Sequence, residues 1–289
     1  MTSAAASMSR PAPPSGRPPY ERLTIYYLNG RAGHGPFPFD DRFIGNWEED
    51  DCSFLFFSAA ADNAVRRFLR HRPELILADT FDMSYEEWQS LDAFPLVAGG
   101  WCVYPPWLPR PAIPDTRPVL LDPGVVFGSG AHTTTRDCLE ALAALRRETG
   151  GQALDSAVDI GTGTGLLAVC ASLSGCRRVV ALDINFLAAR TAHNNARLNK
   201  VADRIMVCKG DGGAFAHDPP DLLMANIHYD VMRRLIAADS FCSCRYFILS
   251  GLLRTPARKA RSQLEQLPVK IIKIWNTDQI WCTILGKVL

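Results

Sequence analysis

The stretch D-S-A-V-D-I-G-T-G-T-G, residues 155 to 165, decides the fold of the second half of the chain. Ala157, Val158 and Ile160 form a short apolar run, three glycines follow at alternate positions, and a helical apolar pattern begins at Leu166. This order predicts a buried strand, a tight turn and a helix. A turn without side chains lets backbone N–H groups approach a nucleotide at the positive end of a helix. The stretch therefore predicts a nucleotide site.

The spacing of the glycines indicates which nucleotide is expected. Gly161, Gly163 and Gly165 give G-x-G-x-G, and Leu166 stands where a dinucleotide fingerprint has its third glycine. This departure favours a ligand with a single adenosyl group, S-adenosylmethionine, over NAD.

Strands and helices alternate regularly around this turn. Apolar runs predict strands over 157–160, 178–183, 204–208, 221–225 and 246–250, and helices over 133–149, 165–174, 186–199, 229–238 and 255–267. Such alternation gives βαβ units and a parallel sheet buried on both faces. The last expected strands, 270–275 and 280–285, are joined by about four residues, so they should form an antiparallel hairpin. We therefore expect an α/β fold with a seven-stranded, mostly parallel, Rossmann-like sheet of the class I methyltransferase type.

The first half of the chain predicts a second, smaller unit. Residues 1–20 hold five prolines, four serines and no acidic residue, and we expect a disordered tail there, with a targeting segment as the alternative. Residues 21–104 predict an N-terminal α+β domain. Six prolines over 105–118 predict a stiff linker, and 119–289 form the second domain.

Within that N-terminal unit the pattern predicts only some of the elements. A capping-box spacing from Ser84 to Glu87 precedes an expected helix. The other expected elements are strands over 22–27, 55–58 and 101–104 and a helix over 63–71.

Bulk properties exclude several classes of protein. The net charge of the 289 residues is +1, so no overall field draws the chain to nucleic acid or to an anionic membrane. No apolar run approaches the roughly 20 residues of a membrane span. Nine cysteines without C-x-x-C spacing fit reduced thiols better than disulfides or a metal site. These features favour a cytoplasmic protein without a metal.

Three polar residues end neighbouring strands, where a parallel sheet binds its ligand. Asp183 is expected to accept both ribose hydroxyls, with a helix-capping role as the alternative. Asp211 is expected to accept from the adenine amine, and a simple turn acid is equally compatible with its D-G-G context. Asn226 is expected to hold a ligand group or an incoming amine, with an Asx turn as its alternative.

A second glycine-rich stretch, L-D-P-G-V-V-F-G-S-G-A-H-T-T-T, runs from Leu121 to Thr135. Its glycines permit an irregular loop, and its threonines can cap the helix that follows. Placed over the glycine turn, this loop would close on the methionine end of the ligand.

Together with other motifs, this loop resembles the PrmA family, the methyltransferase of ribosomal protein L-eleven. The family loop D-P-G-x-x-F-G-x-G-x-H-x-T-T matches from Asp122 through Thr135. The family's P-P-W, A-N-I, L-S-G-[IL]-L and terminal tryptophan strand match at Pro105–Trp107, Ala225–Ile227, Leu249–Leu253 and Trp281–Cys282. The resemblance covers residues 101 to 289 in order.

The resemblance implies particular cofactor contacts: Thr135, Gly161, Asp183 and Asn226. We also include Gly163 of the turn and Phe127 of the loop among the expected contacts. The family methylates lysine side chains and an N-terminal amine, and its small N-terminal domain recruits the ribosomal protein.

The chain also departs from the family pattern. His132 is followed by Thr133 where the family has proline, and His228 and Tyr229 follow A-N-I where the family has small residues. Residues 1–100 carry no family motif. These departures concern the protein substrate more than the cofactor.

Methyl transfer to an amine requires alignment of acceptor, carbon and sulfur rather than a strong base. We therefore expect Asn226 to act as the catalytic residue by orienting a neutral amine. The leading hypothesis is an S-adenosylmethionine-dependent methyltransferase acting on a protein, most simply a ribosomal one, without direct nucleic-acid contact. The alternatives are a small-molecule methyltransferase, an NAD-dependent oxidoreductase and a non-catalytic module.

Overall fold

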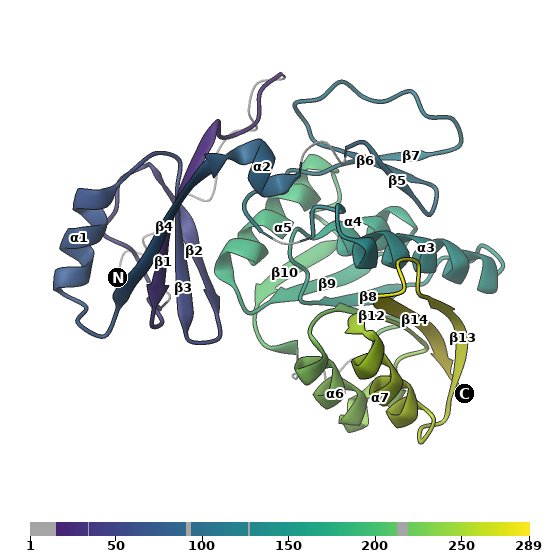
Figure 1. The fold of residues 1–289 in the computed structure, drawn as a ribbon. Helices are drawn as coiled ribbons and strands as arrows, with labels where there is room; N and C mark the ends of the chain where they lie inside the picture. The colour runs from purple at the N-terminus through teal and green to yellow at the C-terminus, as the bar shows by residue number, and fades with distance from the viewer. Residues whose placement is uncertain (1–15, 34, 91–93, 127, 213–218) are drawn as a thin grey trace, which may run out of the picture.

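The computed structural model describes residues 16–33, 35–90, 94–126, 128–212 and 219–289 (Figure 1). Its largest sheet has the order β10-β9-β8-β11-β12-β14-β13. The strands are β8 (Ser156–Ile160), β9 (Arg178–Asp183), β10 (Ile205–Lys209), β11 (Leu222–Asn226), β12 (Tyr246–Leu253), β13 (Val269–Trp275) and β14 (Trp281–Val288). Pairs from β10 to β12 are parallel, and β14 runs antiparallel to both of its neighbours. The expected fold class, including the final hairpin, is confirmed.

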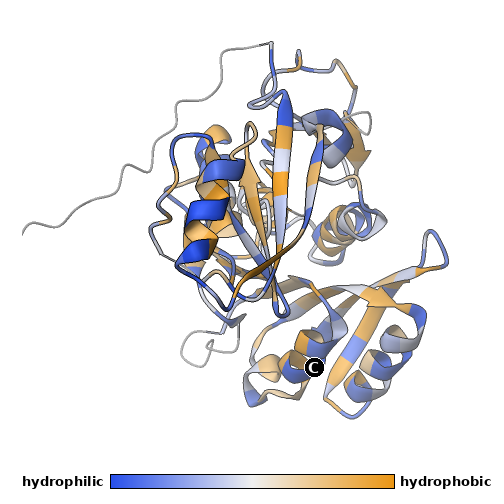
Figure 2. Ribbon diagram, turned by 60° about the vertical axis from the view of Figure 1, so that its left-hand side comes forward, coloured by the Kyte–Doolittle hydropathy of each residue, from blue (hydrophilic) through white to orange (hydrophobic). Residues whose placement is uncertain are grey.

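Helices cover both faces of this sheet. On one face lie α3 (Thr133–Glu148), α4 (Leu166–Leu173) and α5 (Phe186–Leu198). On the other lie α6 (Tyr229–Ala237), the short 3-10 helix η3 (Asp239–Ser243) and α7 (Arg254–Leu264). Hydrophobic and hydrophilic segments alternate along the outer helices (Figure 2), because each buries one stripe on the sheet, whereas α4 is buried over nearly its whole length. None of the helices formed by the described residues is both long and apolar enough to cross a bilayer.

The N-terminal unit is a four-stranded antiparallel sheet in the order β2-β3-β1-β4. Its elements are β1 (Arg22–Asn29), β2 (Phe43–Glu49), β3 (Cys52–Phe57), α1 (Asp62–Arg70) and β4 (Ile76–Ser84). Val65 and Phe68 of α1 pack against one face. The strands expected at 22–27 and 55–58 correspond to β1 and β3. The strand β4 lacked a burial pattern to predict it because it is an edge strand, exposed over most of its length.

The capping box is present. The Ser84 hydroxyl oxygen accepts from the Glu87 N–H at 3.1 Å, and a Glu87 carboxylate oxygen accepts from the Ser84 N–H at 2.8 Å. These two bonds satisfy the free donors at the start of α2 (Tyr85–Gln89), as its spacing predicted.

The proline-rich segment joins two strands of one small sheet. β6 (Trp101–Tyr104) pairs antiparallel with β5 (Leu96–Ala98) and parallel with β7 (Arg117–Leu120). Side chains of all three strands share a core with α3. The division of the chain into domains stays a proposal, and this packing favours a boundary just before β5 rather than inside 105–118.

The N-terminal sheet contacts the larger unit at the first two turns of α5. Ile25 and Phe56 belong to one buried cluster with Leu187 and Ala188. The Arg190 guanidinium donates to the Ile44 carbonyl oxygen at 2.5 Å. The N-terminal sheet therefore lies beside the carboxyl end of β9, where α5 begins.

Candidate functional site

The glycine turn, residues 161–165, connects β8 to α4 as expected. Its backbone is tied to the neighbouring strand, because the Thr162 N–H donates to the Leu182 carbonyl of β9 at 2.8 Å. Gly161 has a φ of +69°, and a Cβ there would lie 2.3 Å from Ile227 Cγ2. Glycine suits this position, because the φ is left-handed and a Cβ would collide with the Ile227 side chain.

Asp183 ends β9 and closes on this turn. One carboxylate oxygen accepts from the Gly163 N–H at 3.0 Å, and the other accepts from the Asn185 N–H at 2.9 Å. Burial raises the pKa of Asp183, while these two N–H donors act to lower it. The carboxylate thus fixes the turn and the start of α5, and each oxygen retains a lone pair for a further donor.

The glycine-rich loop lies against the glycine turn. The Thr164 hydroxyl donates to the Gly128 carbonyl oxygen at 2.7 Å. The Asn195 side chain donates to the carbonyls of Asp122 and Thr164, both at 2.8 Å, and accepts from the Asp122 N–H at 2.8 Å. One fully buried amide therefore ties loop, turn and α5 together. Sequence reasoning missed Asn195, because nothing in its helical context marks it as a clamp.

The loop ends at α3, whose first turn holds Thr135. His132 caps this helix by accepting from the Thr134 N–H at 3.3 Å, and its ring packs edge-on against Trp281 at 4.9 Å. Burial lowers the pKa of His132. The Thr135 hydroxyl is buried and has no hydrogen-bond partner among the described residues. A buried hydroxyl of this kind fits a site that a polar ligand group completes.

Asn226 ends β11 on the other side of the turn. It lies opposite Ser250 of β12, and the Ile227 N–H donates to the Ser250 carbonyl at 3.2 Å. Gly251 approaches Ile227 so closely that a Cβ on it would lie 2.6 Å from the Ile227 carbonyl oxygen. Asn226 itself is half-buried, and no hydrogen bond within the described residues occupies its amide.

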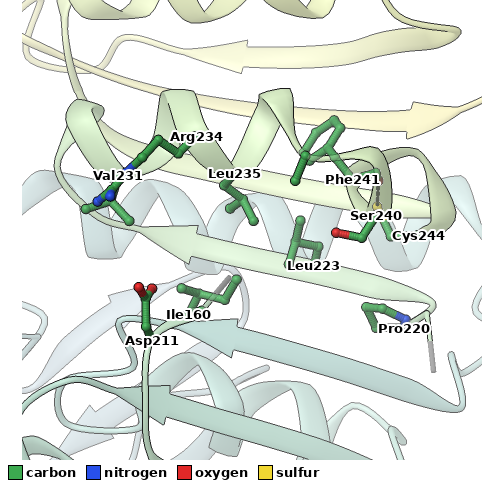
Figure 3. Close-up of a pocket in the computed structure, with 12 residues that line it drawn as sticks. Ile160, Asp211, Pro220, Leu223, Val231, Arg234, Leu235, Ser240, Phe241 and Cys244 are labelled. Atoms are coloured by element: carbon green, nitrogen blue, oxygen red, sulfur yellow. Dashed lines mark hydrogen bonds between the residues drawn. The ribbon is translucent and has the colours of Figure 1, made fainter. Parts of the chain in front are cut away.

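Asp211 follows β10, and the Gly210 N–H donates to the Asp183 carbonyl at 2.9 Å. Its side chain is exposed and points toward α6 across a cavity of about 150 Å³ (Figure 3). Apolar side chains dominate this cavity, including Ile160, Leu223, Val231 and Phe241. Asp211 thus lies at the same edge as Asp183, and its expected contact with adenine stays a prediction.

The structure brings most of the expected residues to one edge. Gly161, Gly163, Asp183, Asp211 and Asn226 follow the carboxyl ends of four adjacent parallel strands. Thr135 follows the glycine-rich loop, which the hydrogen bond from Thr164 to Gly128 holds against the glycine turn. Phe127 lies outside the described residues.

Two apolar residues at this edge were missed. Ile184 and Phe186 flank Asn185, and they are 64% and 47% exposed. Large apolar side chains left in solvent beside the glycine turn offer a surface on which a flat aromatic ring could pack. Phe186 also lines a cavity of about 380 Å³ between α5 and β2. The available signal was two large apolar residues within three positions after Asp183.

Within the described residues, neither the cysteines nor any cluster of possible metal ligands forms a second site. None of the nine cysteines forms a disulfide. No cluster of three or more histidine, cysteine, aspartate or glutamate side chains gathers there in a way that could hold a metal ion.

The arrangement of loop, glycine turn and strand ends matches one protein family. The family model described as "Ribosomal protein L11 methyltransferase (PrmA)" matches residues 79–288. The chain belongs to the PrmA family. The match to the family model begins within β4, so strands β1 to β3 of this chain lie outside the matched residues.

Individual relatives agree with this assignment. A ribosomal protein L11 methyltransferase of Exiguobacterium sibiricum is 33% identical over 187 residues, which cover 64% of this chain and 58% of that protein. One of Desulfitobacterium hafniense is 36% identical over 180 residues, covering 61% and 56%. The crystal structure of a ribosomal protein L11 methylase from Lactobacillus delbrueckii subsp. bulgaricus superimposes with a TM-score of 0.57 at 26% identity, covering 66% of this chain and 96% of that one. The chain thus spans about three fifths of the length of the curated relatives it matches.

Proposed function

We propose that the protein is an S-adenosylmethionine-dependent methyltransferase that modifies amine nitrogens of a protein, most simply a ribosomal protein. The observation that carries the proposal is the contact between Thr164 of the glycine turn and Gly128 of the glycine-rich loop. This contact supports a single enclosed site beside Asp183 and Asn226. Membership of the PrmA family supports the same reaction.

In this proposal the chain's own residues bind and orient. The turn N–H groups and Asp183 hold the ribose, Ile184 covers the adenine and Thr135 binds the polar methionine end. S-adenosylmethionine would supply a methyl group on a sulfonium, which needs no metal and no general base for its displacement. Asn226 accepts a hydrogen bond from the acceptor amine and so directs its lone pair toward the methyl.

The acceptor must reach this site without its proton. A lysine amine has an ordinary pKa near 10.4, and removal from water lowers it. The half-buried position of Asn226 supports such an environment. We also place the activity in the cytoplasm, which the absence of disulfides among the nine cysteines supports.

The experiment incubates the full chain with a labelled methyl donor and purified ribosomal proteins. We expect label in one protein band, and mass spectrometry then locates the methylated amine. An Asn226→Ala variant should lose most of the transfer, while its affinity for the donor should fall much less than that of Asp183→Ala. Binding of the donor without transfer to any protein would overturn the protein-substrate assignment.

A further inference from the structure

The face of the N-terminal sheet that packs on α5 continues beyond that contact as a row of aromatic side chains. Trp47, Phe54 and Tyr27 stand side by side on β2, β3 and β1, because Phe54 is the register partner of both others. The rings of Tyr27 and Phe54 stack at 4.9 Å. All three residues are half-buried. This aromatic row therefore keeps part of its surface available to a partner.

Carboxylates lie at one end of the aromatic row and on the neighbouring strand β4. Glu49, Asp50 and Asp51 form the exposed β2–β3 turn, and within the described chain none of them makes an ion pair. Asp79 of β4 lies opposite Tyr27 in register and shares its face of the sheet. We refer to these four residues as the acidic rim.

The charge of the unit as a whole has the same sign. Residues 21–89 contain thirteen acidic and seven basic residues, a formal charge of −6, so the rest of the chain carries +7. Four of the seven basic residues lie in or directly after α1, which covers the opposite face: Arg66, Arg67, Arg70 and Arg72. The aromatic row thus lies on the acidic side of the sheet.

We propose that the aromatic row and the acidic rim together form the docking surface for a lysine- and arginine-rich segment of the protein substrate. Aromatic faces attract ammonium and guanidinium groups, and the carboxylates complement their charge. RNA, whose bases also stack on aromatic sheets, needs a basic surround for its phosphates. The acidic rim opposes that alternative.

This inference rests on the proposed function and names its substrate-recruiting surface. The surface shares a face with the contact to Leu187, four residues after Asp183. A segment docked there is therefore near the carboxyl edge of the larger sheet. The strands β1 to β3 lie before residue 79, outside the family match, so the match does not itself supply the aromatic row.

The test compares two triple charge reversals in the full chain. The rim variant is Glu49→Lys with Asp51→Lys and Asp79→Lys. The control variant, Asp203→Lys with Asp239→Lys and Glu265→Lys, changes the net charge equally on exposed positions of the larger unit. The probe is a fluorescent peptide of alternating lysine and alanine, titrated at low salt by anisotropy.

We expect the rim variant to weaken peptide binding about tenfold or more, and the control to weaken it about twofold or less. Trp47→Leu, which retains every charge, should weaken it about threefold or more. Both triple variants should bind S-adenosylmethionine as the unaltered chain does, which shows that the larger unit is intact.

Three outcomes would overturn the inference. Equal weakening by rim and control reversals would reduce the effect to net charge. Binding of a fluorescent twelve-nucleotide RNA that Trp47→Leu weakens would assign the surface to nucleic acid. A chain lacking residues 1–15 that binds the peptide about tenfold more tightly would assign it to the chain's own tail.

The methylation assay separates this inference from the proposed function. If the unaltered chain methylates a ribosomal protein and the rim variant raises KM while leaving kcat, both stand. If methylation proceeds with an unchanged KM, only the docking surface fails. If the unaltered chain transfers nothing to protein, the proposed function fails whatever the peptide shows.

Discussion

The carboxyl edge of the seven-stranded sheet and the aromatic row of the N-terminal sheet are built in opposite ways. At the carboxyl edge, buried backbone contacts and carboxylates hold the glycine turn against its neighbours, as at Gly161 and Asp183. The aromatic row instead consists of half-buried side chains on three paired strands, brought side by side by strand register. A site that closes on a small cofactor must be preorganised, whereas a surface that meets a protein need only present complementary groups.

The largest expected effect comes from a substitution at the carboxyl edge of the seven-stranded sheet. Replacing Gly161 by alanine forces a side chain into Ile227 and a positive φ at once, and should lower the free energy of unfolding by about 2–4 kcal/mol. Cofactor binding should fall below detection in calorimetry. The matched control is Gly150→Ala, which has a φ of +62° but no atom within 4 Å of the added Cβ. It should lose only about 1 kcal/mol and bind normally.

Removal of the Asp183 carboxylate comes next. Asp183→Ala should weaken cofactor binding tenfold or more, consistent with roughly 1.5–3 kcal/mol for a charged hydrogen bond. Asp221 is a suitable control, because its carboxylate also accepts from two N–H groups, those of Asp155 and Ser156, but at the amino end of the sheet. Asp221→Ala should reduce stability and leave the affinity unchanged. Equal affinities for all three proteins would remove Asp183 from the site.

The pH dependence of stability tests the buried carboxyl group that lies below the glycine turn. Asp159 is fully buried below the turn, and burial raises its pKa to about 6 despite hydrogen bonds from Thr162 and Ala168. Because the folded pKa lies above the ordinary value, the stability present at low pH is lost as pH rises through about 6. Asp159→Asn should abolish about 1–3 kcal/mol of that fall.

Chemical denaturation between pH 4 and pH 7.5 measures this fall. The control is Asp155→Asn, whose carboxylate pairs with Arg177 and has a lowered pKa, so its loss should leave the fall in place. A fall of unchanged size in Asp159→Asn would contradict the assignment to Asp159, since Asp183, whose pKa is also raised, accounts for only part of it.

The smallest effect concerns the loop. Thr164→Val removes the hydroxyl that donates to Gly128 and should cost about 1 kcal/mol of stability. Hydrogen exchange in residues 122–135 should become faster, because the loop loses a contact with the turn. Thr116→Val removes a similar bond, to the Ile113 carbonyl, far along the proline-rich segment. It should not change exchange in the loop.

The two regions also differ in how far sequence predicts them. The turn at 161–165, the strand ends at Asp183 and Asn226, and the final hairpin follow from backbone geometry, and such constraints leave glycines and spacing in the sequence. The role of Asn195 was not predicted, because its partners Asp122 and Thr164 lie 73 and 31 residues away in the sequence. The edge strand β4 and the pairing of β6 with β7 were not predicted, because neither leaves a local burial pattern in the sequence.

The aromatic row left no signal for a similar reason. Trp47, Phe54 and Tyr27 are separated in sequence and become neighbours only through the register of three strands. An aromatic residue in a strand is ordinarily a core residue. Only the packing shows that these three are half-exposed beside acidic residues.

The central claim is that the cofactor binds at the carboxyl edge between the glycine turn and the glycine-rich loop. Hydrogen–deuterium exchange of the full chain with and without S-adenosylhomocysteine tests it most directly. The account predicts slower exchange in peptides covering 161–165 and 122–135, with no change over β1 to β3. Binding that leaves both of those peptides unprotected, or that protects the N-terminal sheet instead, would contradict it.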